Sequence, residues 1–583
     1  MKKRLLIPLS LLAISLLAGC SSNNKTTNII NGSDYGYNKQ VSINEPEEIE
    51  VNENNNEFEI STSDGEYLTS NNIYTIKKAG TYALSGKLTG QILIEANEED
   101  EVILELNNVS INYDQDSPIK AISGDKLEIS AKKDTENMIT DNRKAKTTEI
   151  DSQGEGAISA DIDLKLKGTG TLVVVGNYNN GVHTSKDLTI QKLKLKATGY
   201  NNALKGKDSV TIVSGTIQAY ALTGNGIKTD DSDVSSKGNQ RGTVTINGGE
   251  IYVDSLHDAI DASYDILIDE IDTEVATSLT IKTGLNSTNY NKSTFKADSE
   301  KGLKAANEII INKGTVVIAA SDDAIHANYG ETLENSSKGL GNITINDGLI
   351  QVASGDDGLH ADNTLTINGG KIVITGSSEG YEANYINING GYSYIYGTDD
   401  GVNCSKKSFN NCAFTMTDGY LDVAVKSGDT DGIDSNGNFT LSGGTIITRG
   451  SPGTAGGMST GLDVDGTISM TGGTLIAFNG LERSPSASSV IKYAGTSSSN
   501  QGMGGPGGGR QGRGEQSSSS ISLEAGNYKL SGNDLEINFT NDYNYSSFQI
   551  YSSLLSTNNT YSLTKEGTTV LSWTQSSNSV TIS

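Results

Sequence analysis

Proline, tryptophan, histidine and positive charge are all scarce in this chain of 583 residues. It has 6 Pro, 1 Trp and 4 His, and its 44 Lys and Arg are outnumbered by 71 Asp and Glu, which gives a formal net charge of −27. Nucleic acid is therefore not an expected partner, because phosphate binding depends on clustered Lys and Arg. Hydrophobic residues make up only 34%, too little for one compact core in a chain of this length. An elongated repeat needs only a thin core.

The start of the chain resembles a bacterial lipoprotein signal. A basic segment at 2–4 precedes an apolar segment at 5–17 that is too short to span a bilayer, and Leu-Ala-Gly-Cys follows at 17–20. The resemblance implies that residues 1–19 are a signal peptide and that Cys20 carries a lipid. The protein would then be anchored on the extracellular face of the bacterial cell envelope, touching the membrane through its lipid alone. An uncleaved anchor or secretory signal with an accidental Cys is the alternative.

Two further cysteines, Cys404 and Cys412, remain in the chain. Outside the cell they could form a disulfide across this short step. The alternative is two small buried apolar residues, and the sequence does not decide between the two.

The central part of the chain is an internal repeat. An acidic or amide residue, Gly or Ala, an aliphatic residue and a polar residue recur about every 21 to 25 residues where no loop intervenes. Examples are Asp-Ala-Ile-His at 323–326 and Asp-Gly-Leu-His at 357–360, and a second phrase, Thr-Ile-Asn-Gly-Gly, follows at 366–370. Each unit has room for two or three strands of about four residues between Gly, Asn and Asp turns, and none for a helix.

This period predicts an all-β fold, a right-handed parallel β-helix of about a dozen coils, in which strands on successive coils lie about 4.8 Å apart. The Leu and Asn spacing of leucine-rich repeats is missing, and a propeller blade needs roughly twice the period. Longer steps at 227–260, 260–303 and 325–359 indicate loops inserted into single coils. Such loops often collect on the functional face of a solenoid.

The predicted domain organisation follows the composition of the chain. Residues 20–56 are rich in Asn, Ser, Thr and Glu and are expected to be a disordered tether. The β-helix occupies 57–490, and a Gly- and Ser-rich linker or loop occupies 491–520. Residues 521–583 form a small β module or a cap, with Trp573 as its core anchor.

Several phrases, taken in their order, resemble one family. Gly-Thr-Tyr-Ala-Leu-Ser-Gly at 80–86, the acidic and aliphatic run at 100–109 and the segment at 176–182 are similar to those of the carbohydrate-binding β-helix family of bacterial surface proteins, and the likeness covers about residues 74–480. The resemblance implies a protein that binds calcium, recognises cellulose or acidic sugars such as polygalacturonate, and has a fold like that of pectate lyases. A monomer whose partner is an extracellular polysaccharide is therefore expected.

Aligning the coils places acidic residues in one column with further acids beside it. The column holds Asp323, Asp357, Glu379, Asp400 and Asp431, and the neighbours are Asp322, Asp356 and Asp399. Like charges about 4 to 5 Å apart repel by ~1 kcal/mol in water and by more in a partly buried turn. Calcium, which takes six to eight oxygen ligands, is predicted to neutralise the column. The alternative is a solvated turn whose Asp side chains accept backbone hydrogen bonds.

His326 and His360 occupy equivalent positions on adjacent coils beside these acids. A transition-metal pair is one interpretation. Simple duplication of a residue type by the repeat is the one that the sequence favours.

A row of tyrosines is predicted on an outer face. Because Ile372 and Ile374 alternate inward, Lys371, Val373 and Thr375 point outward, and the residues that replace these three in the next coil are expected to do the same. The row comprises Tyr392, Tyr394 and Tyr396, with Tyr252 and Tyr420 in the same columns. Exposed tyrosines offer a flat surface on which sugar rings can lie. The alternative is that Tyr simply suits an exposed strand.

A calcium-dependent polysaccharide (pectate) lyase is the second functional hypothesis. Lyases of this kind use a Lys or Arg as base next to bound calcium, and Lys228 and Lys304 stand in the column that holds the two histidines. A nearby calcium ion would lower the pKa of such a lysine. No lyase-specific Arg and Lys cluster occurs, so binding without catalysis is preferred. A surface adhesin that recognises protein is a third hypothesis.

Overall fold

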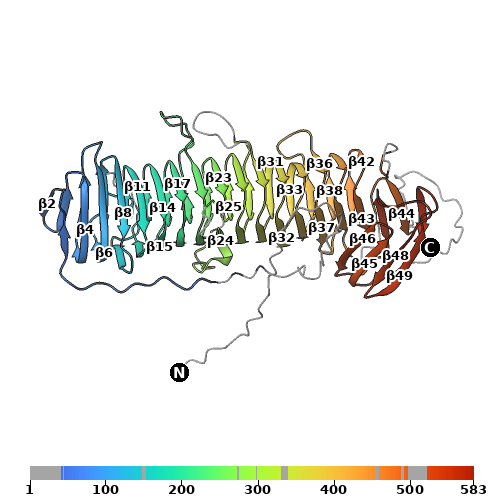
Figure 1. Cartoon of the computed structure of the whole chain (residues 1–583), viewed down its shortest axis with the longest axis horizontal. Coiled ribbons are helices and arrows are strands. Elements are labelled where there is room, and N and C mark those ends of the chain that lie inside the picture. The colour runs from blue at the N-terminus through green and yellow to red at the C-terminus, as the bar shows by residue number, and fades with distance from the viewer. Residues whose placement is uncertain are drawn as a thin grey trace, which may run out of the picture.

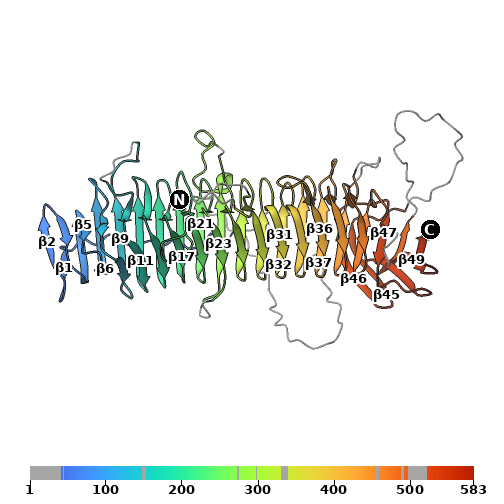
Figure 2. The same ribbon diagram turned by 90° about the horizontal axis from the view of Figure 1, so that it is seen from above.

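The chain forms a long rod with a small second sheet at its C-terminal end (Figures 1 and 2). A computed structural model describes residues 41, 43, 45–147, 153–271, 275–296, 298–329, 339–452, 459–486, 491–496 and 521–582. The predicted signal peptide, Cys20 and most of the predicted tether and linker lie outside the described residues. Within them, no helix is long and apolar enough to cross a bilayer.

The rod is a parallel β-helix, as predicted, in which a typical coil contributes three strands to three faces. Face A contains β3 (Ile73–Ile76), β5 (Gln91–Glu95), β7 (Ile119–Ser123), β10 (Gly156–Ala160), β13 (Asn180–Thr184), β16 (Leu204–Gly206), β19 (Ile227–Lys228), β22 (Ile260–Ala262), β25 (Leu303–Ala305), β28 (Ile325–Ala327), β31 (Leu359–Ile367), β33 (Tyr381–Ile388), β35 (Val402–Cys404), β38 (Ile433–Ser435) and β41 (Leu462–Val464). The long strands β31 and β33 continue around the corner onto face B.

Face B follows face A along each coil. It contains β4 (Gly80–Thr89), β6 (Glu101–Tyr113), β8 (Lys126–Ala131), β11 (Asp163–Gly168), β14 (Asp187–Gln191), β17 (Ser209–Ile212), β20 (Thr243–Ile246), β23 (Asp265–Ile268), β26 (Glu308–Ile311), β29 (Asn342–Ile345), β36 (Ala413–Met416), β39 (Asn438–Leu441) and β42 (Ile468–Met470).

Face C closes each coil. It contains β9 (Glu136–Asp141), β12 (Thr171–Gly176), β15 (Leu193–Gly199), β18 (Gly215–Ala221), β21 (Glu250–Ser255), β24 (Ser278–Thr283), β27 (Thr315–Ala319), β30 (Leu349–Ala353), β32 (Lys371–Gly376), β34 (Tyr392–Gly397), β37 (Tyr420–Val425), β40 (Thr445–Arg449) and β43 (Thr474–Phe478). A short 3-10 helix, η2 (Gly284–Asn286), follows β24.

In-register stacking builds a narrow core of aliphatic ladders. On face B the fully buried ladder runs through Ile268, Ile311, Ile345, Ile367 and Ile388. Near the C-terminal end aromatic residues replace the aliphatic ones, and the rings of Phe414 and Phe439 stack 5.0 Å apart. Because each coil repeats the inward pattern of the previous one, the core remains thin along the whole rod.

The Ile-Asn-Gly-Gly phrase makes the turn from face B to face C. Side-chain amides stack there, with Asn368 Nδ2 donating to Asn346 Oδ1 at 2.8 Å and Asn389 Nδ2 donating to Asn368 Oδ1 at 2.9 Å. The second glycine has a positive φ, +77° at Gly391, and a Cβ there would lie 2.7 Å from the backbone of Gly369. The second glycine of the recurring phrase is therefore required, because successive coils lie too close together for a side chain at this position.

Antiparallel strands close both ends of the rod. At the N-terminal end, β1 (Glu59–Ser61) pairs with β4 and β2 (Tyr67–Ser70) pairs with β3. At the other end β47 (Phe548–Ser552) pairs antiparallel with β43 and with β44 (Lys492–Thr496), and β50 (Ser579–Ile582) pairs with β44. Residues 492–496 therefore form a strand in a range where a linker was predicted, because β47 and β50 supply the pairing partners.

A four-stranded antiparallel sheet forms a module at the C-terminal end, in the order β46 (Leu535–Asn541), β45 (Gly526–Gly532), β48 (Thr560–Lys565) and β49 (Thr568–Thr574). Trp573 is buried in its core against Tyr561. The C-terminal segment is thus both a module and, through β47, a cap.

Residues 45–56, which we call the strap, run along the outside of face C instead of forming a tether (Figure 1). The backbone N–H of Ile49 donates to Gln218 Oε1 at 3.0 Å, and that of Asn54 donates to Ser110 Oγ at 2.8 Å. Ile49 is itself buried. The prediction of disorder is wrong for this segment, because outward side chains of several coils satisfy its backbone.

Arg449 joins the module to the rod. It is buried, it pairs with the buried carboxylate of Asp422, and its Nε donates to Asn541 Oδ1 at 2.8 Å. Its Nη2 donates to the carbonyl of Thr540 at 2.9 Å. One side chain of β40 therefore contacts both face C and β46.

We expect Arg449→Met to destabilise the chain by about 3–5 kcal/mol, because Asp422 would be left buried without a countercharge. Thermal unfolding measures the loss, and hydrogen exchange of β46 shows whether the module separates from the rod. Arg483→Met is the control, since its side chain is half exposed and should contribute within about 1 kcal/mol. Equal effects of the two substitutions would contradict this role of Arg449.

Candidate functional site

The predicted tyrosine platform is largely covered. The register is as expected, with Tyr392 beside Tyr420 on successive strands, but Tyr394 and Tyr396 are only 1% and 6% exposed. The C-terminal module covers this part of face C, and the Tyr420 hydroxyl donates to the carbonyl of Asn538 on β46 at 3.4 Å. The prediction of an exposed surface is therefore wrong here.

The strap covers Tyr252 in the same way. Its hydroxyl donates to the Glu45 carboxylate at 2.5 Å, and the side chain is 4% exposed. Alternation along a strand distinguishes side chains that point into the core from side chains that point outward. It does not show whether another segment of the chain covers the outward side chains. Face C is covered at both ends by segments distant in the sequence.

Face A carries an outward polar ladder that changes in charge along the rod. In register order it comprises His183, Lys205, Lys228, Asp261, Lys304, His326, His360, Glu382, Asn403, Asp434 and Asp463. The first half is predominantly basic, the two histidines lie in the middle, and acids follow.

The acidic column lies in the turn that leads into face A. One oxygen of each of three carboxylates accepts a backbone N–H from the next coil: Asp357 N donates to Asp323 Oδ1 at 3.0 Å, Glu379 N to Asp357 Oδ1 at 3.1 Å, and Asp431 N to Asp400 Oδ1 at 2.7 Å. The predicted alternative, in which these side chains accept backbone hydrogen bonds, is therefore found for one of the two oxygens of each carboxylate. The other oxygen does not take part in these bonds.

Two overlapping groups of oxygens could hold a cation. The first is Asp322, Asp323 and Asp356, and the second is Asp356, Asp357 and Glu379, with the ligand atoms of each group within 4.8 Å of one another. Asp356, which is exposed, belongs to both. All donors are carboxylate oxygens, the set that hard cations such as calcium prefer. The structure thus brings together five of the eight predicted ligands.

The other three predicted ligands, Asp399, Asp400 and Asp431, continue the column beyond these two groups. At the opposite end Lys301 replaces an acid, and its Nζ lies 2.8 Å from Asp322 Oδ2 and 2.8 Å from Asp323 Oδ2. One ammonium group therefore already compensates the column there.

Burial and like charge disfavour ionisation along the column. Burial, together with the adjacent carboxyls of Glu379 and Glu382, raises the pKa of Asp357 to about 9. Burial raises the pKa of Asp400 to about 8, with the charges of Asp431 and Asp434 acting in the same direction. A bound divalent cation would reverse this effect, because it stabilises the ionised form.

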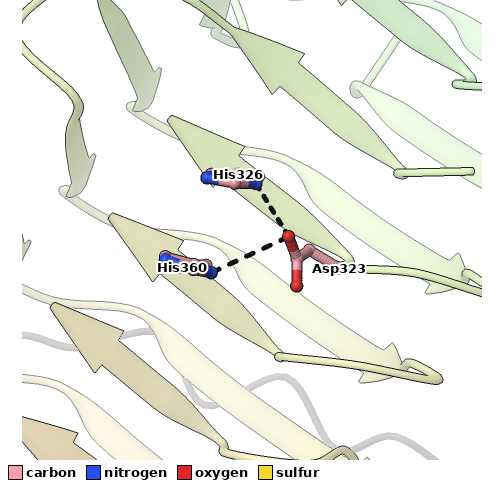
Figure 3. A group of neighbouring side chains, drawn as sticks. All are labelled: Asp323, His326 and His360. Atoms are coloured by element: carbon pink, nitrogen blue, oxygen red, sulfur yellow. Dashed lines mark ion pairs between the residues drawn. The ribbon is translucent and has the colours of Figure 1, made fainter. Parts of the chain in front are cut away.

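The two histidines contact the column directly (Figure 3). His326 Nδ1 lies 2.7 Å from Asp323 Oδ2, and His360 Nδ1 lies 3.8 Å from the same atom and 3.0 Å from Asp357 Oδ2. Although Asp323 is buried, these imidazoles and Lys301 hold its pKa well below the usual range. Placing the histidines on adjacent coils was correct, but their contact with Asp323 was not predicted.

An aromatic patch that the sequence did not single out lies beside this cluster. The ring of Phe409 is 4.7 Å from that of Tyr329 and 6.4 Å from that of Tyr385, and all three side chains are half-buried. The backbone N–H of Tyr329 donates to Asp362 Oδ2 at 2.9 Å, which ties the patch to the histidines. The signal in the sequence was indirect, since Tyr329 lies within the long step 325–359, which was predicted to contain an inserted loop.

The two lysines proposed for a lyase differ in their surroundings. Lys228 Nζ lies 2.5 Å from Asp261 Oδ2, and although burial acts in the opposite direction, the acids around it raise the pKa of Lys228. A base needs a lowered pKa, so this residue does not suit that role in the structure. Lys304 Nζ lies 3.9 Å from Asp258 Oδ2.

Cys404 and Cys412 are buried free thiols. Burial and the neighbouring Cys412 raise the pKa of Cys404, and its Sγ donates to the carbonyl of Asn384 at 3.2 Å. The structure shows the apolar alternative rather than the disulfide.

The fold and the site together define a parallel β-helix with a stacked acidic column in the turn that leads into face A. A family model described as carbohydrate-binding domain-containing protein matches residues 70–337 and 330–451. The chain belongs to this family.

Two relatives illustrate the similarity. A carbohydrate-binding domain-containing protein of Acetivibrio thermocellus is 35% identical over 117 residues, which are 20% of this chain and 41% of that protein. The chain thus spans about two fifths of the length of this curated relative. The solved gadolinium derivative of a polysaccharide lyase-like protein from C. thermocellum is 32% identical, with a TM-score of 0.35, over 38% of this chain and 86% of that one.

We expect the stability of the chelated protein to fall as the pH rises from 5 to 9. Asp357 and Asp400, with pKa values of about 9 and about 8, retain protons in the folded state that the unfolded chain releases near pH 4. The surrounding carboxylates raise the pKa of His360 to about 12 against the effect of burial. The folded state therefore keeps an imidazole proton that the unfolded chain releases near pH 6.5, so the contribution of His360 to stability also falls as the pH rises above that value.

Thermal unfolding in chelator across this pH range measures the effect, and the melting temperature should fall by at least several degrees. Asp400→Asn should flatten the dependence, whereas Asp534→Asn, an exposed residue of the module, should leave it unchanged. A melting temperature that rises toward pH 9 in chelator would contradict this account of the column.

Proposed function

We propose that the protein binds extracellular polysaccharide on face A, next to calcium held by the acidic column. The observation that carries this proposal is the pair of oxygen groups that share the exposed Asp356. Membership of the family supports a carbohydrate ligand. Face C is the weaker candidate because the strap and the module cover its tyrosines.

The charge of the chain bears on which polysaccharides would bind. At −27 the protein repels a polyuronate, and screening over about 8 Å at physiological salt does not remove the repulsion at contact. Calcium in the column inverts the local sign, and coordination positions left open by the protein can accept uronate carboxylates. Cation bridging therefore resolves the conflict between two acidic partners.

The patch formed by Tyr329, Tyr385 and Phe409 supplies a surface for the apolar faces of sugar rings. It lies beside Asp362, across the two histidines from Asp323. Aromatic side chains of this kind pack against sugar rings while their polar edges remain hydrated. We assign to it the stacking role that the covered tyrosines of face C do not fill.

Binding without cleavage is the activity we propose. Lys228 is paired with Asp261 and has a raised pKa. Lys301, beside the oxygen groups, has a pKa that Asp322 and Asp323 raise against the effect of burial, so it does not suit the role of a base either. Incubation with polygalacturonate and calcium should therefore release no unsaturated uronide. Steady release that Lys304→Ala abolishes would establish the lyase hypothesis instead.

We expect polygalacturonate binding to require calcium and to fall at least about tenfold in Asp356→Asn, because this residue is shared by both oxygen groups. Affinity electrophoresis or calorimetry with and without chelator measures it. Asp534→Asn is the matched control. Calcium-independent binding of full strength would refute bridging, and circular dichroism in chelator shows whether the fold persists.

The aromatic patch provides a second arm of the same experiment. Phe409→Ala should weaken both cellulose and polygalacturonate binding, by about 1 kcal/mol or roughly fivefold for one lost stacking contact. Cellulose binding should survive chelation. Tyr394→Phe keeps the covered ring and should have no effect, so equal losses in the two variants would argue against the patch.

We further propose that the protein is a lipoprotein anchored at Cys20, on the basis of the Leu-Ala-Gly-Cys pattern after a short apolar segment. Cys20→Ser should release the protein into the medium or leave it unprocessed. Metabolic labelling with a fatty acid, followed by fractionation, measures both. A variant that remains lipid-labelled in the membrane fraction would disprove the anchor.

A further inference from the structure

The stacked histidines form a nitrogen-containing site that calcium binding does not use. His326 on β28 and His360 on β31 lie with ring centroids 4.2 Å apart and planes inclined by 10°. Calcium selects oxygen donors, whereas imidazole nitrogen suits zinc, nickel and copper. The pair therefore calls for an explanation that goes beyond the proposed function.

One edge of each ring faces the acidic column (Figure 3). The Nδ1 atoms lie 2.7 Å and 3.8 Å from Asp323 Oδ2, and the three ligand atoms lie within 4.8 Å of one another. His326 is only 8% exposed, and within the described part of the chain its Nδ1 makes no hydrogen bond of acceptable geometry despite the short contact. A buried nitrogen so close to a carboxylate without a well-aligned hydrogen bond is unusual.

The opposite edge of both rings faces Asp362, and His360 Nε2 also lies 3.4 Å from Glu382 Oε2. Asp362 Oδ1 lies 3.3 Å from His326 Nε2 and 3.2 Å from His360 Nε2. Asp362 is itself held, because its Oδ2 accepts the backbone N–H of Tyr329 at 2.9 Å. A carboxylate that accepts the distal N–H of a histidine is the usual partner of a metal-ligating imidazole, since it fixes the tautomer and the ring orientation.

With Nε2–H directed at Asp362, the Nδ1 lone pairs point toward Asp323. Lone pairs that face a carboxylate need positive charge between them. A divalent cation placed between the two Nδ1 atoms and Asp323 Oδ2 would supply this charge.

We propose that His326 Nδ1, His360 Nδ1 and Asp323 bind one zinc ion, with a water molecule in the fourth position. Asp357 Oδ2 lies 3.0 Å from His360 Nδ1, but it belongs with His360 and Glu382 to a separate group of neighbouring ligand atoms. In tetrahedral zinc with bonds of about 2.0–2.1 Å, ligand atoms are about 3.3 Å apart, a value bracketed by the 2.7 Å and 3.8 Å contacts here. One ring turns out of the stack to direct its lone pair at the ion.

The zinc site adjoins the calcium groups. Asp322, Asp356 and Glu379 contact no histidine in this arrangement and remain available to calcium. Zinc at Asp323 would add positive charge next to the calcium group of Asp322, Asp323 and Asp356. Its existence does not depend on polysaccharide binding.

The test is calorimetric titration of the chelator-treated full chain with Zn²⁺ in millimolar calcium. We expect one equivalent to bind, with affinity reduced at least tenfold in His326→Asn and in His360→Asn. Asp362→Asn should reduce it by about 10–100-fold through the lost orientation of both rings. His257→Asn, a histidine outside every such group of the described residues, is the matched control and should bind like wild type.

X-ray absorption at the zinc edge provides a readout that needs no variant, and two imidazole ligands are expected. The proposal would be overturned if no zinc binds in the presence of calcium, or if the bound zinc has no imidazole ligand. It would also be overturned if neither histidine substitution changes zinc binding. The same histidine variants should still bind polygalacturonate in calcium. If wild-type protein binds polysaccharide but not zinc, this site is contradicted and the proposed function is not. If it binds zinc but not polysaccharide, the proposed function is contradicted and this site is not.

Discussion

In-register stacking of successive coils, about 4.8 Å apart, is the constraint on which the rest of this structure depends. It places each residue next to its equivalent on the following coil, so a residue type that recurs at one position of the repeat forms a continuous row along the rod. Inward aliphatic residues become continuous ladders such as that of Ile345 and Ile367, and asparagines become an amide stack. The same rule makes a column of carboxylates an electrostatic problem that grows with each coil.

The molecule meets this problem in three ways. Backbone N–H groups of the next coil neutralise part of the charge, as at Asp323 and Asp400. Lys301 brings positive charge to the first coils of the column, where the two histidines also contact Asp323 and Asp357. Where neither suffices, burial and repulsion raise the pKa of Asp357 and Asp400. The cation binding that we propose would replace these retained protons and would link stability, pH and ligand binding at one place.

Coverage of the faces determines where a ligand can bind. The strap and the C-terminal module cover face C, where Tyr252, Tyr394 and Tyr396 are buried, and Arg449 helps hold the module there. Face A keeps its polar ladder, and the half-buried ring of Phe409 lies beside its histidines. The acids, the histidines and an aromatic surface therefore meet on one side of the rod.

Periodicity alone determined the β-helix, the thin core, the inward ladders and the placement of the acids and histidines in neighbouring columns, because these follow from local repetition. The covering of Tyr394 by β46 and of Tyr252 by Glu45 was decided only by the tertiary structure, since neither covering segment carries a repeat that specifies its docking position. The patch of Tyr329, Tyr385 and Phe409 likewise comes from residues on separate coils. Contacts between a repeat and segments outside it depend on shape and on buried charges such as Arg449, and a one-dimensional pattern does not encode them.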